Sequence, residues 1–192
     1  MDQLSLQRRL ALGLGAGALL VSIVAVPTFA SDTVIQAITG SGLTASVADL
    51  VLPGVAYQNG AHNVTGTMVL TADDSTGSGA GWNVTIQSSA LAWVGTANGG
   101  IDIPASKLAL SSAAAPTSIA GQAVSVALST GPQVPPTSPL GTLDTPRKVL
   151  VATAAYGAGT YTQALGVTLT IPAQSRVGVY TGTLTTTITS AP

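Results

Sequence analysis

The sequence contains no cysteine and no glutamate, and charged residues make up only 7% of its 192 positions. Without cysteine there is no disulfide, no thiol nucleophile and no cysteine metal site, so stability must come from a hydrophobic core and strand pairing. Glutamate, lysine and arginine are the residues that solvent-facing helices normally use, and their scarcity argues against a helical protein. The few basic residues form no patch, whereas phosphate binding needs clustered cations. Nucleic acid is therefore not expected as a partner.

Side chains that could carry out catalysis are equally scarce. His62 is the only histidine, and we expect it to be exposed in a polar loop, residues 58–64. A single histidine cannot build a zinc site alone, and no Gly-x-Ser-x-Gly turn supplies a nucleophile beside it. Asp73 and Asp74 are adjacent, and adjacent residues at a strand end point apart, which makes a poor acid–base pair. The sequence predicts a protein that is not an enzyme and has no cofactor.

Two alternatives use the same carboxylates. Asp73 and Asp74 are followed by serine and threonine hydroxyls, and together these oxygens could bind calcium weakly. The D-x-D-x-D spacing of a dedicated calcium loop is missing, so the pattern favours a solvated turn. The second alternative is a glycan hydrolase that uses two of Asp73, Asp74 and Asp102.

The first thirty residues have the three-part pattern of a secretory signal peptide. Arg8 and Arg9 supply the positive charge, an uncharged apolar run extends from Leu10 to about Val26, and small residues precede the cleavage position after Ala30. The alternative is a retained membrane anchor, but the run of about 17 residues is shorter than the ~20 that a bilayer span needs. We therefore expect cleavage after Ala30 and secretion to the outside of the cell.

The remaining chain, residues 31–192, has the length of a single domain with its own core. Apolar and polar residues alternate with a period of two, which is the pattern of a half-buried antiparallel strand. The alternation occurs in four runs, at residues 82–87, 124–128, 165–171 and 180–188. Turn sequences rich in glycine, asparagine and proline separate these runs. The sequence predicts an all-β fold, an antiparallel β-sandwich of the immunoglobulin-like or Greek-key type.

Two tryptophans stand out because aromatic residues make up only 4% of the chain. Trp82 is in phase with Val84 and Ile86, which predicts a place in the core. Trp93 has no such clear phase. It could belong to the core or to a surface that stacks on sugars or partner proteins.

The C-terminal segment YTGTLTTTITSAP resembles the end of the WxL domain, a secreted surface module of Gram-positive bacteria. In that family the segment follows the pattern Tyr-x-x-x-Leu-Thr-Trp-x-Leu. Tyr180, Leu184 and Thr185 match this pattern, Ile188 stands in place of the final leucine, and Thr186 stands in place of tryptophan.

An upstream segment, Trp82-Asn83-Val84, resembles the family's first Trp-x-Leu motif, and the resemblance extends over about residues 65–192. It implies a β-sandwich held non-covalently at the cell surface, often on peptidoglycan, with other surface proteins as further partners. If the second tryptophan of the family carries wall attachment, Thr186 implies that this chain attaches differently. The family-motif positions are Trp82, Val84, Tyr180, Leu184, Thr186 and Ile188.

The alternative function is a self-assembling extracellular fibre subunit, similar to a pilus protein, that polymerises by adding strands. Uncharged strands rich in threonine and valine offer little of the charge that normally blocks pairing at a sheet edge. The segment 31–45 is nearly uncharged and extended, so we expect it to be the donor strand in that case.

Overall fold

The computed structural model describes residues 36–124, 131–137 and 139–190. The predicted signal peptide lies outside these residues. Almost all of the regular structure in the described part is β-strand, with one short 3-10 turn, η1 (Ala105–Lys107). The strands are β1 (Leu43–Val47), β2 (His62–Asp74), β3 (Trp82–Ser88), β4 (Ala92–Val94), β5 (Leu108–Ala113), β6 (Thr117–Gly121), β7 (Gly141–Thr142), β8 (Arg147–Ala152), β9 (Gly159–Ile171), β10 (Val179–Thr181) and β11 (Leu184–Ser190). Within the described residues, no helix has the length and apolar character needed to cross a membrane.

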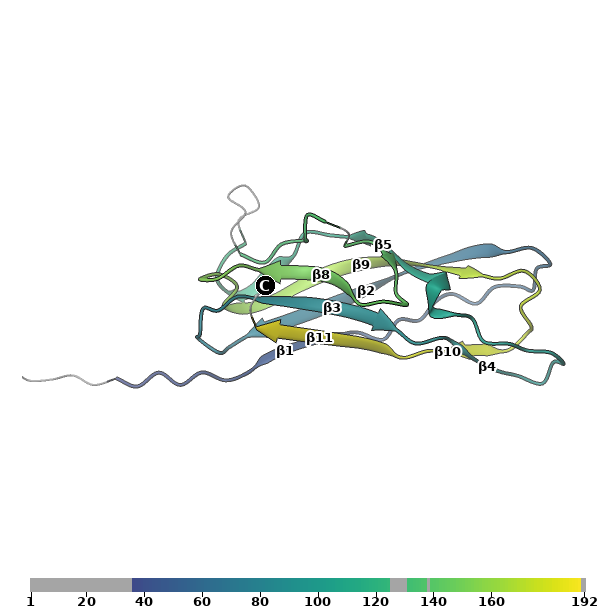
Figure 1. The fold of residues 1–192 in the computed structure, drawn as a ribbon, viewed down its shortest axis with the longest axis horizontal. Helices are drawn as coiled ribbons and strands as arrows, with labels where there is room; N and C mark the ends of the chain where they lie inside the picture. The colour runs from purple at the N-terminus through teal and green to yellow at the C-terminus, as the bar shows by residue number, and fades with distance from the viewer. Residues whose placement is uncertain (1–35, 125–130, 138, 191–192) are drawn as a thin grey trace, which may run out of the picture. The chain divides into compact units, whose positions relative to one another are not determined.

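The strands form two layers in the unit that begins at Ile38 (Figure 1). The larger sheet has the order β1-β2-β9-β5-β7, and β6 also pairs with β9. Its centre is the antiparallel pair β2–β9, which stays in register from His62↔Ile171 to Asp74↔Gly159. The second layer contains the sheet β11-β3-β8 and the two-stranded ribbon β10–β4. This arrangement confirms the predicted all-β, antiparallel sandwich.

The core lies between the two layers. Trp82 of β3 packs against Tyr161 of β9, with ring centroids 6.1 Å apart and planes inclined by 46°. Gln163 of β9 is also buried, and its Nε2 donates to the carbonyl of Val149 in β8 at 3.1 Å. Contacts of both kinds, apolar and polar, therefore join the two sheets across the sandwich.

The period-two alternation explains why these segments form strands. Every second residue of β3 is buried, from Trp82 to Ser88, and the residues between them are only partly covered. Side chains on a strand point to opposite faces in turn, so one face packs on the core while the other meets solvent. The predicted strands at 82–87 and 165–171 are confirmed, while the one at 124–128 falls almost wholly outside the described residues.

The run at 180–188 forms two strands rather than one. β10 pairs with β4, and β11 pairs with β3. Between them, Thr183 is bound by Ser89: the Thr183 amide donates to the Ser89 hydroxyl at 2.9 Å, and the Thr183 carbonyl accepts from the Ser89 amide at 2.9 Å. The chain therefore changes partner at this point while remaining on the same side of the sandwich.

Two predictions about local structure are wrong. His62 does not lie in an exposed loop; it is the first residue of β2, paired with Ile171 and partly buried. The long pairing with β9 extends the strand into a stretch whose composition indicated a loop. The donor-strand prediction for residues 31–45 is wrong for its last three residues, because Leu43–Ala45 already pairs with residues 72–74 of β2.

Candidate functional site

The two motif segments lie side by side. β3 and β11 are antiparallel neighbours, and their register places Val84 opposite Ile188 and Trp82 opposite Ser190. Thr186 pairs with Ile86. Segments about a hundred residues apart in the sequence therefore lie next to each other in one sheet.

Trp82 has a structural place in this element. Its side chain is fully buried, and its Nε1 donates to the carbonyl of Gly157 at 3.0 Å. Gly157 has a positive φ of 88°, and a Cβ there would lie 2.8 Å from Trp82 Nε1. The prediction that Trp82 belongs to the core is confirmed.

The face of β11 that carries the other motif positions is only partly covered. Leu184, Thr186 and Ile188 are half-buried, whereas Thr185 and Thr187 between them are exposed. Leu184 and Thr186 line a large groove, and Ile188 lines a smaller pocket toward the other end of the strand. Tyr180, on β10, pairs with Trp93 and also lines the groove.

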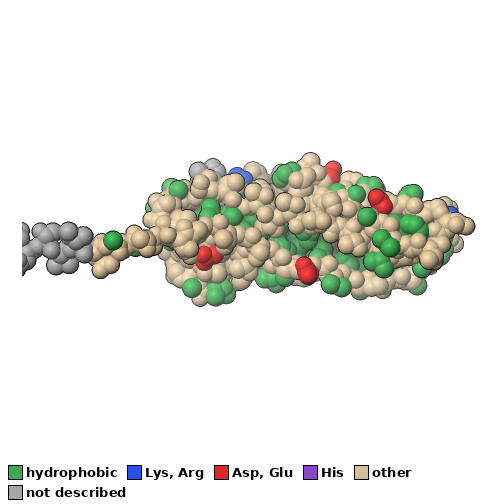
Figure 2. Space-filling model, turned by 90° about the horizontal axis from the view of Figure 1, so that it is seen from below, with side chains coloured by type: hydrophobic (Ala, Val, Ile, Leu, Met, Phe, Trp, Pro, Cys, Tyr) green, Lys and Arg blue, Asp and Glu red, His purple; other side chains and the backbone are tan. Residues whose placement is uncertain are grey.

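The groove, called here the edge groove, has a volume of about 1190 Å³. One wall is residues 46–58, which include the end of β1 and the chain that follows it, and the other is residues 175–184 with Thr186. Figure 2 views this side of the domain and shows hydrophobic side chains gathered in and around a hollow. One wall begins on β1 of the larger sheet and the other includes β10 and β11 of the second layer, so the groove runs along one side of the sandwich.

The bottom of the edge groove reaches the core. Leu91, Leu108 and Leu169 are each less than a tenth exposed, yet all three line the groove. The wall formed by residues 46–58 is held over β2 at Gly66, where a Cβ would lie 2.7 Å from a methyl carbon of Leu52. The groove thus extends from the surface to side chains of the core, and its lining is more apolar than polar.

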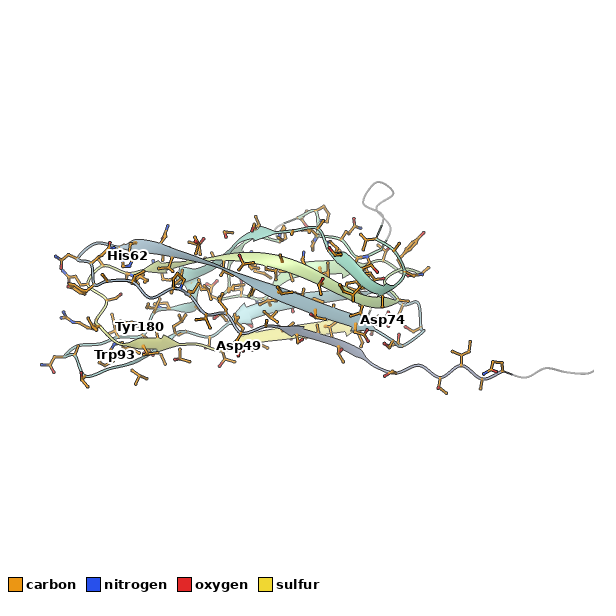
Figure 3. All side chains as sticks on the ribbon, turned by 180° about the vertical axis from the view of Figure 1, so that it is seen from behind. Asp49, His62, Asp74, Trp93 and Tyr180 are labelled. Atoms are coloured by element: carbon orange, nitrogen blue, oxygen red, sulfur yellow. The ribbon has the colours of Figure 1, made fainter. Side chains whose placement is uncertain are left out.

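The polar residues that line the edge groove are mostly uncharged, and its two charged residues have opposite signs. Asp49 and Arg176 are its charged residues, one on each wall. The hydroxyl of Tyr180 donates to the Arg176 carbonyl at 2.8 Å, which ties β10 to the turn before it. In Figure 3, His62 and Tyr180 lie toward one end, with Asp49 farther along. The Nε2 of His62 is buried and has no hydrogen-bond partner in the described part of the chain.

The carboxylates proposed for catalysis or calcium binding do not converge. Asp73 accepts from the hydroxyls of Ser75 and Thr160 at 2.5 and 2.6 Å, and these bonds hold the pKa of Asp73 below its ordinary value. Asp74 is buried on the other face of β2 and accepts from the backbone amide and hydroxyl of Thr76. The prediction that the two carboxylates point apart is confirmed.

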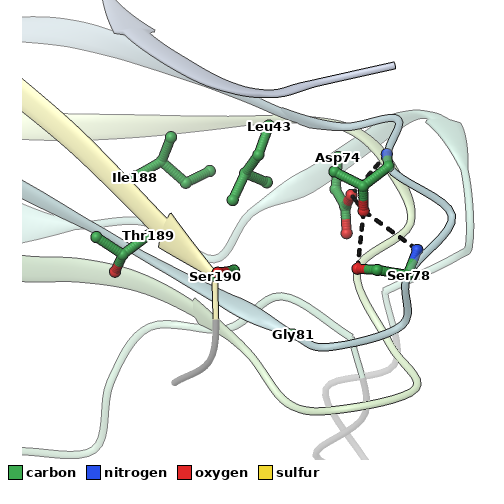
Figure 4. A pocket seen from close by; sticks show the side chains of 8 residues that line it. Leu43, Asp74, Ser78, Gly81, Ile188, Thr189 and Ser190 are labelled. Carbon is green, nitrogen blue, oxygen red and sulfur yellow. Dashed lines mark hydrogen bonds between the residues drawn. The ribbon is translucent and has the colours of Figure 1, made fainter. Parts of the chain in front are cut away.

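Asp74 lines the smaller pocket, about 460 Å³ in volume, beside Ser78 and Ser190 (Figure 4). Asp102 lies elsewhere: it accepts from the backbone amide of Trp93 at 2.9 Å, and Figure 3 places Trp93 at the opposite end from Asp74. Among the residues that the structure describes, no group of three acidic or histidine side chains could hold a metal ion.

Trp93 is packed in a cradle of glycines. A Cβ at Gly95 would lie 2.8 Å from the indole ring, and one at Gly100 or Gly178 would overlap it. The ring is partly buried, and its Nε1 has no hydrogen-bond partner in the described residues. Trp93 is therefore neither a core residue of the main sandwich nor a freely exposed stacking platform.

Comparison with known protein families matches nearly the whole chain to one family. The family model described as WxL domain surface cell wall-binding matches residues 17–192. The chain belongs to the WxL family. No curated protein and no solved structure matches it.

Membership of the WxL family gives the broad biological setting. The WxL domain is a cell wall-binding module, so this chain is a cell-surface protein with a binding role. The family is a cell wall-binding family and not an enzyme family.

Sequence reasoning missed one wall of the site in this WxL domain. Residues 46–58 form half of the edge groove, but only their first two residues belong to a strand. The signal was present in the sequence: the apolar run from Leu50 to Ala56 does not alternate and contains a Pro-Gly pair. Such a run has no strand period, and in the structure only Leu50 and Leu52 pack against the core while Val51 and Val55 stay exposed.

Proposed function

We propose that this WxL domain is a secreted, non-catalytic module that attaches non-covalently to the cell envelope through the edge groove. The observation that supports this most directly is the position of the groove: its wall includes Leu184 and Thr186, motif positions on β11. The partner is peptidoglycan or another surface protein. Concave, mostly apolar sites with a few polar groups are the usual form of a binding site.

Thr186 gives the sharpest test of this proposal. Its half-buried side chain faces the edge groove, whereas Thr187, the next residue, is exposed on the opposite face of the same strand. A Thr186→Glu substitution places a carboxylate in the apolar channel, and Thr187→Glu places the same charge outside it. We expect Thr186→Glu to reduce co-sedimentation of the mature protein with purified Gram-positive cell walls at least tenfold, and Thr187→Glu to leave it unchanged.

A second pair of variants separates an effect on the groove from an effect on folding. Val55 lines the edge groove and is 48% exposed, while Val69 on β2 is 45% exposed and is not part of the groove. Glutamate at position 55 introduces a charge at the mouth of the channel, and glutamate at position 69 introduces it at an equally exposed site elsewhere. Equal wall binding by Val55→Glu and Val69→Glu, with both proteins folded, would show that the groove is not the attachment site.

A further inference from the structure

The free edge of β10 and β11 gives the edge groove a specific chemistry. β11 pairs only with β3, and β10 pairs only with β4, within the described residues. An antiparallel ladder directs the N–H and C=O groups of every second residue away from the partner strand. Along β10 and the first part of β11 these groups have no strand partner in the described residues and border the edge groove, whereas the rest of β11 lies beside β1.

The opposite wall does not satisfy these backbone groups. The amide of Ala48 donates to the Val69 carbonyl at 3.0 Å, which extends the pairing of β1 with β2 by one residue. Beyond it, residues 49–58 make no backbone hydrogen bond to β10 or β11 in the part of the chain that the structure describes. The two walls are therefore separated by a channel with one unpaired strand edge along its side.

We propose that the edge groove binds an extended polypeptide segment of a partner surface protein, which pairs with β10 and β11 as an added strand. This inference rests on the proposed function and names the ligand of the same site. An unpaired strand edge is complementary to another polypeptide backbone, with amides at strand spacing, and a polysaccharide or a lipid has no such ladder. The backbone edge thus selects the class of ligand.

The side chains of the groove define the partner segment further. Strand residues point alternately to the two faces, so every second side chain of the added strand enters the apolar channel above Leu108 and Leu169. The groove-lining part of β10 and β11, residues 179–186, accommodates about eight residues, or roughly 27 Å of strand. With one acidic and one basic residue on its walls, Asp49 and Arg176, the groove fits a segment of near-zero net charge.

The chain's own N-terminal segment is not placed to fill this channel. Residues 38–42 precede β1 at Leu43, and Leu43 lines the smaller pocket with Ser190, at the end of β11 that the edge groove does not include. Residues 36–42 form no strand and are exposed, with Ile38 91% exposed. The described part of this segment therefore lies away from the channel, and we take the added strand to come from another chain.

The test is a selection of random nine-residue peptides displayed on phage against the mature protein, residues 31–192, with depletion on Thr186→Glu. We expect the selected peptides to carry apolar residues at every second position and little net charge. A synthetic version should bind wild type and Thr187→Glu equally, and Thr186→Glu at least tenfold more weakly. Methylating the peptide amides that face β10 and β11 should weaken binding at least tenfold, while methylating the intervening amides should not.

Three results would overturn the inference. The first is that no peptide is enriched. The second is that binding survives methylation of the amides expected to face β10 and β11. The third is a synthetic peptide of residues 31–42 as the tightest ligand, which would make the partner a second copy of this chain. These failures are distinct from failure of the proposed function, which is decided by whether cell walls bind Thr186→Glu as well as wild type. Loss of wall binding in Thr186→Glu together with peptide failure would leave a glycan as the ligand of the groove.

Discussion

Replacing Trp82 with phenylalanine tests the account of the core. Trp82 is fully buried, and its Nε1 donates to the Gly157 carbonyl at 3.0 Å. Phenylalanine cannot donate this bond, so a buried carbonyl loses its partner at a cost of about 1–3 kcal/mol. The smaller ring also leaves a cavity beside Tyr161, which brings the expected loss in the free energy of unfolding to about 2–4 kcal/mol. For a domain of this size that loss corresponds to a decrease in Tm of roughly 5–15 °C.

Trp93 supplies the matched control. Its indole is partly buried, and its Nε1 makes no hydrogen bond within the described residues. Trp93→Phe therefore removes a similar amount of ring without removing a hydrogen bond, and we expect a loss below about 1 kcal/mol. Thermal unfolding of a protein consisting of residues 31–192, followed by far-ultraviolet circular dichroism, measures both variants. Equal losses, or a larger loss in Trp93→Phe, would refute the claim that the bond to Gly157 distinguishes the two tryptophans.

Three further predictions concern single residues. Gly157→Ala adds a side chain at a residue with φ of 88° and places its Cβ 2.5 Å from the Cβ of Ala152. The Tm should therefore fall by several degrees, and an unchanged Tm would contradict this geometry. Hydrogen bonds lower the pKa of Asp73, so its carboxylate stabilises the fold above the ordinary pKa of about 3.9, and this stability is lost as pH falls through the lowered pKa. Asp73→Asn should therefore flatten the acid side of a plot of Tm against pH. The same slope in the variant and the wild type would contradict the role of these hydrogen bonds. Gly66→Val should displace Leu52, because a Cβ at position 66 would lie 2.7 Å from a Leu52 methyl carbon. We expect weaker wall binding in the sedimentation assay from a protein that remains folded. Unchanged wall binding, or loss of the fold, would show that the assay does not report this contact.

Much of the fold follows from local patterns in the sequence. The alternation through Trp82, Val84 and Ile86 indicates a strand with one buried face, and β3 has that face in the structure. The same period places Leu184, Thr186 and Ile188 on one side of β11. These predictions succeed because the side-chain period of a strand is a property of the backbone alone and needs no knowledge of the partner strand.

Local patterns failed where strand pairing overrode composition. His62 lies in a polar stretch typical of a loop, but the register of β2 with β9 continues to this residue and makes it part of a strand. Leu43 to Ala45 were predicted to be part of a donor strand for another subunit, but they pair with β2 of their own domain. In both cases a strand distant in the sequence supplies the hydrogen bonds, and the local sequence of a segment does not identify the strand with which it pairs.

The sequence alone determined that this chain is a β-sandwich without disulfides, with Trp82 in its core and a WxL-like segment at its C-terminal end. Only the tertiary structure decided where the two motif segments meet and what lies beside them. The edge groove joins residues 46–58 to residues 175–186, and its chemistry depends on which strand edges remain unpaired. That depends on the order of strands in each sheet, which arises from long-range pairing and cannot be read from the period of any one strand.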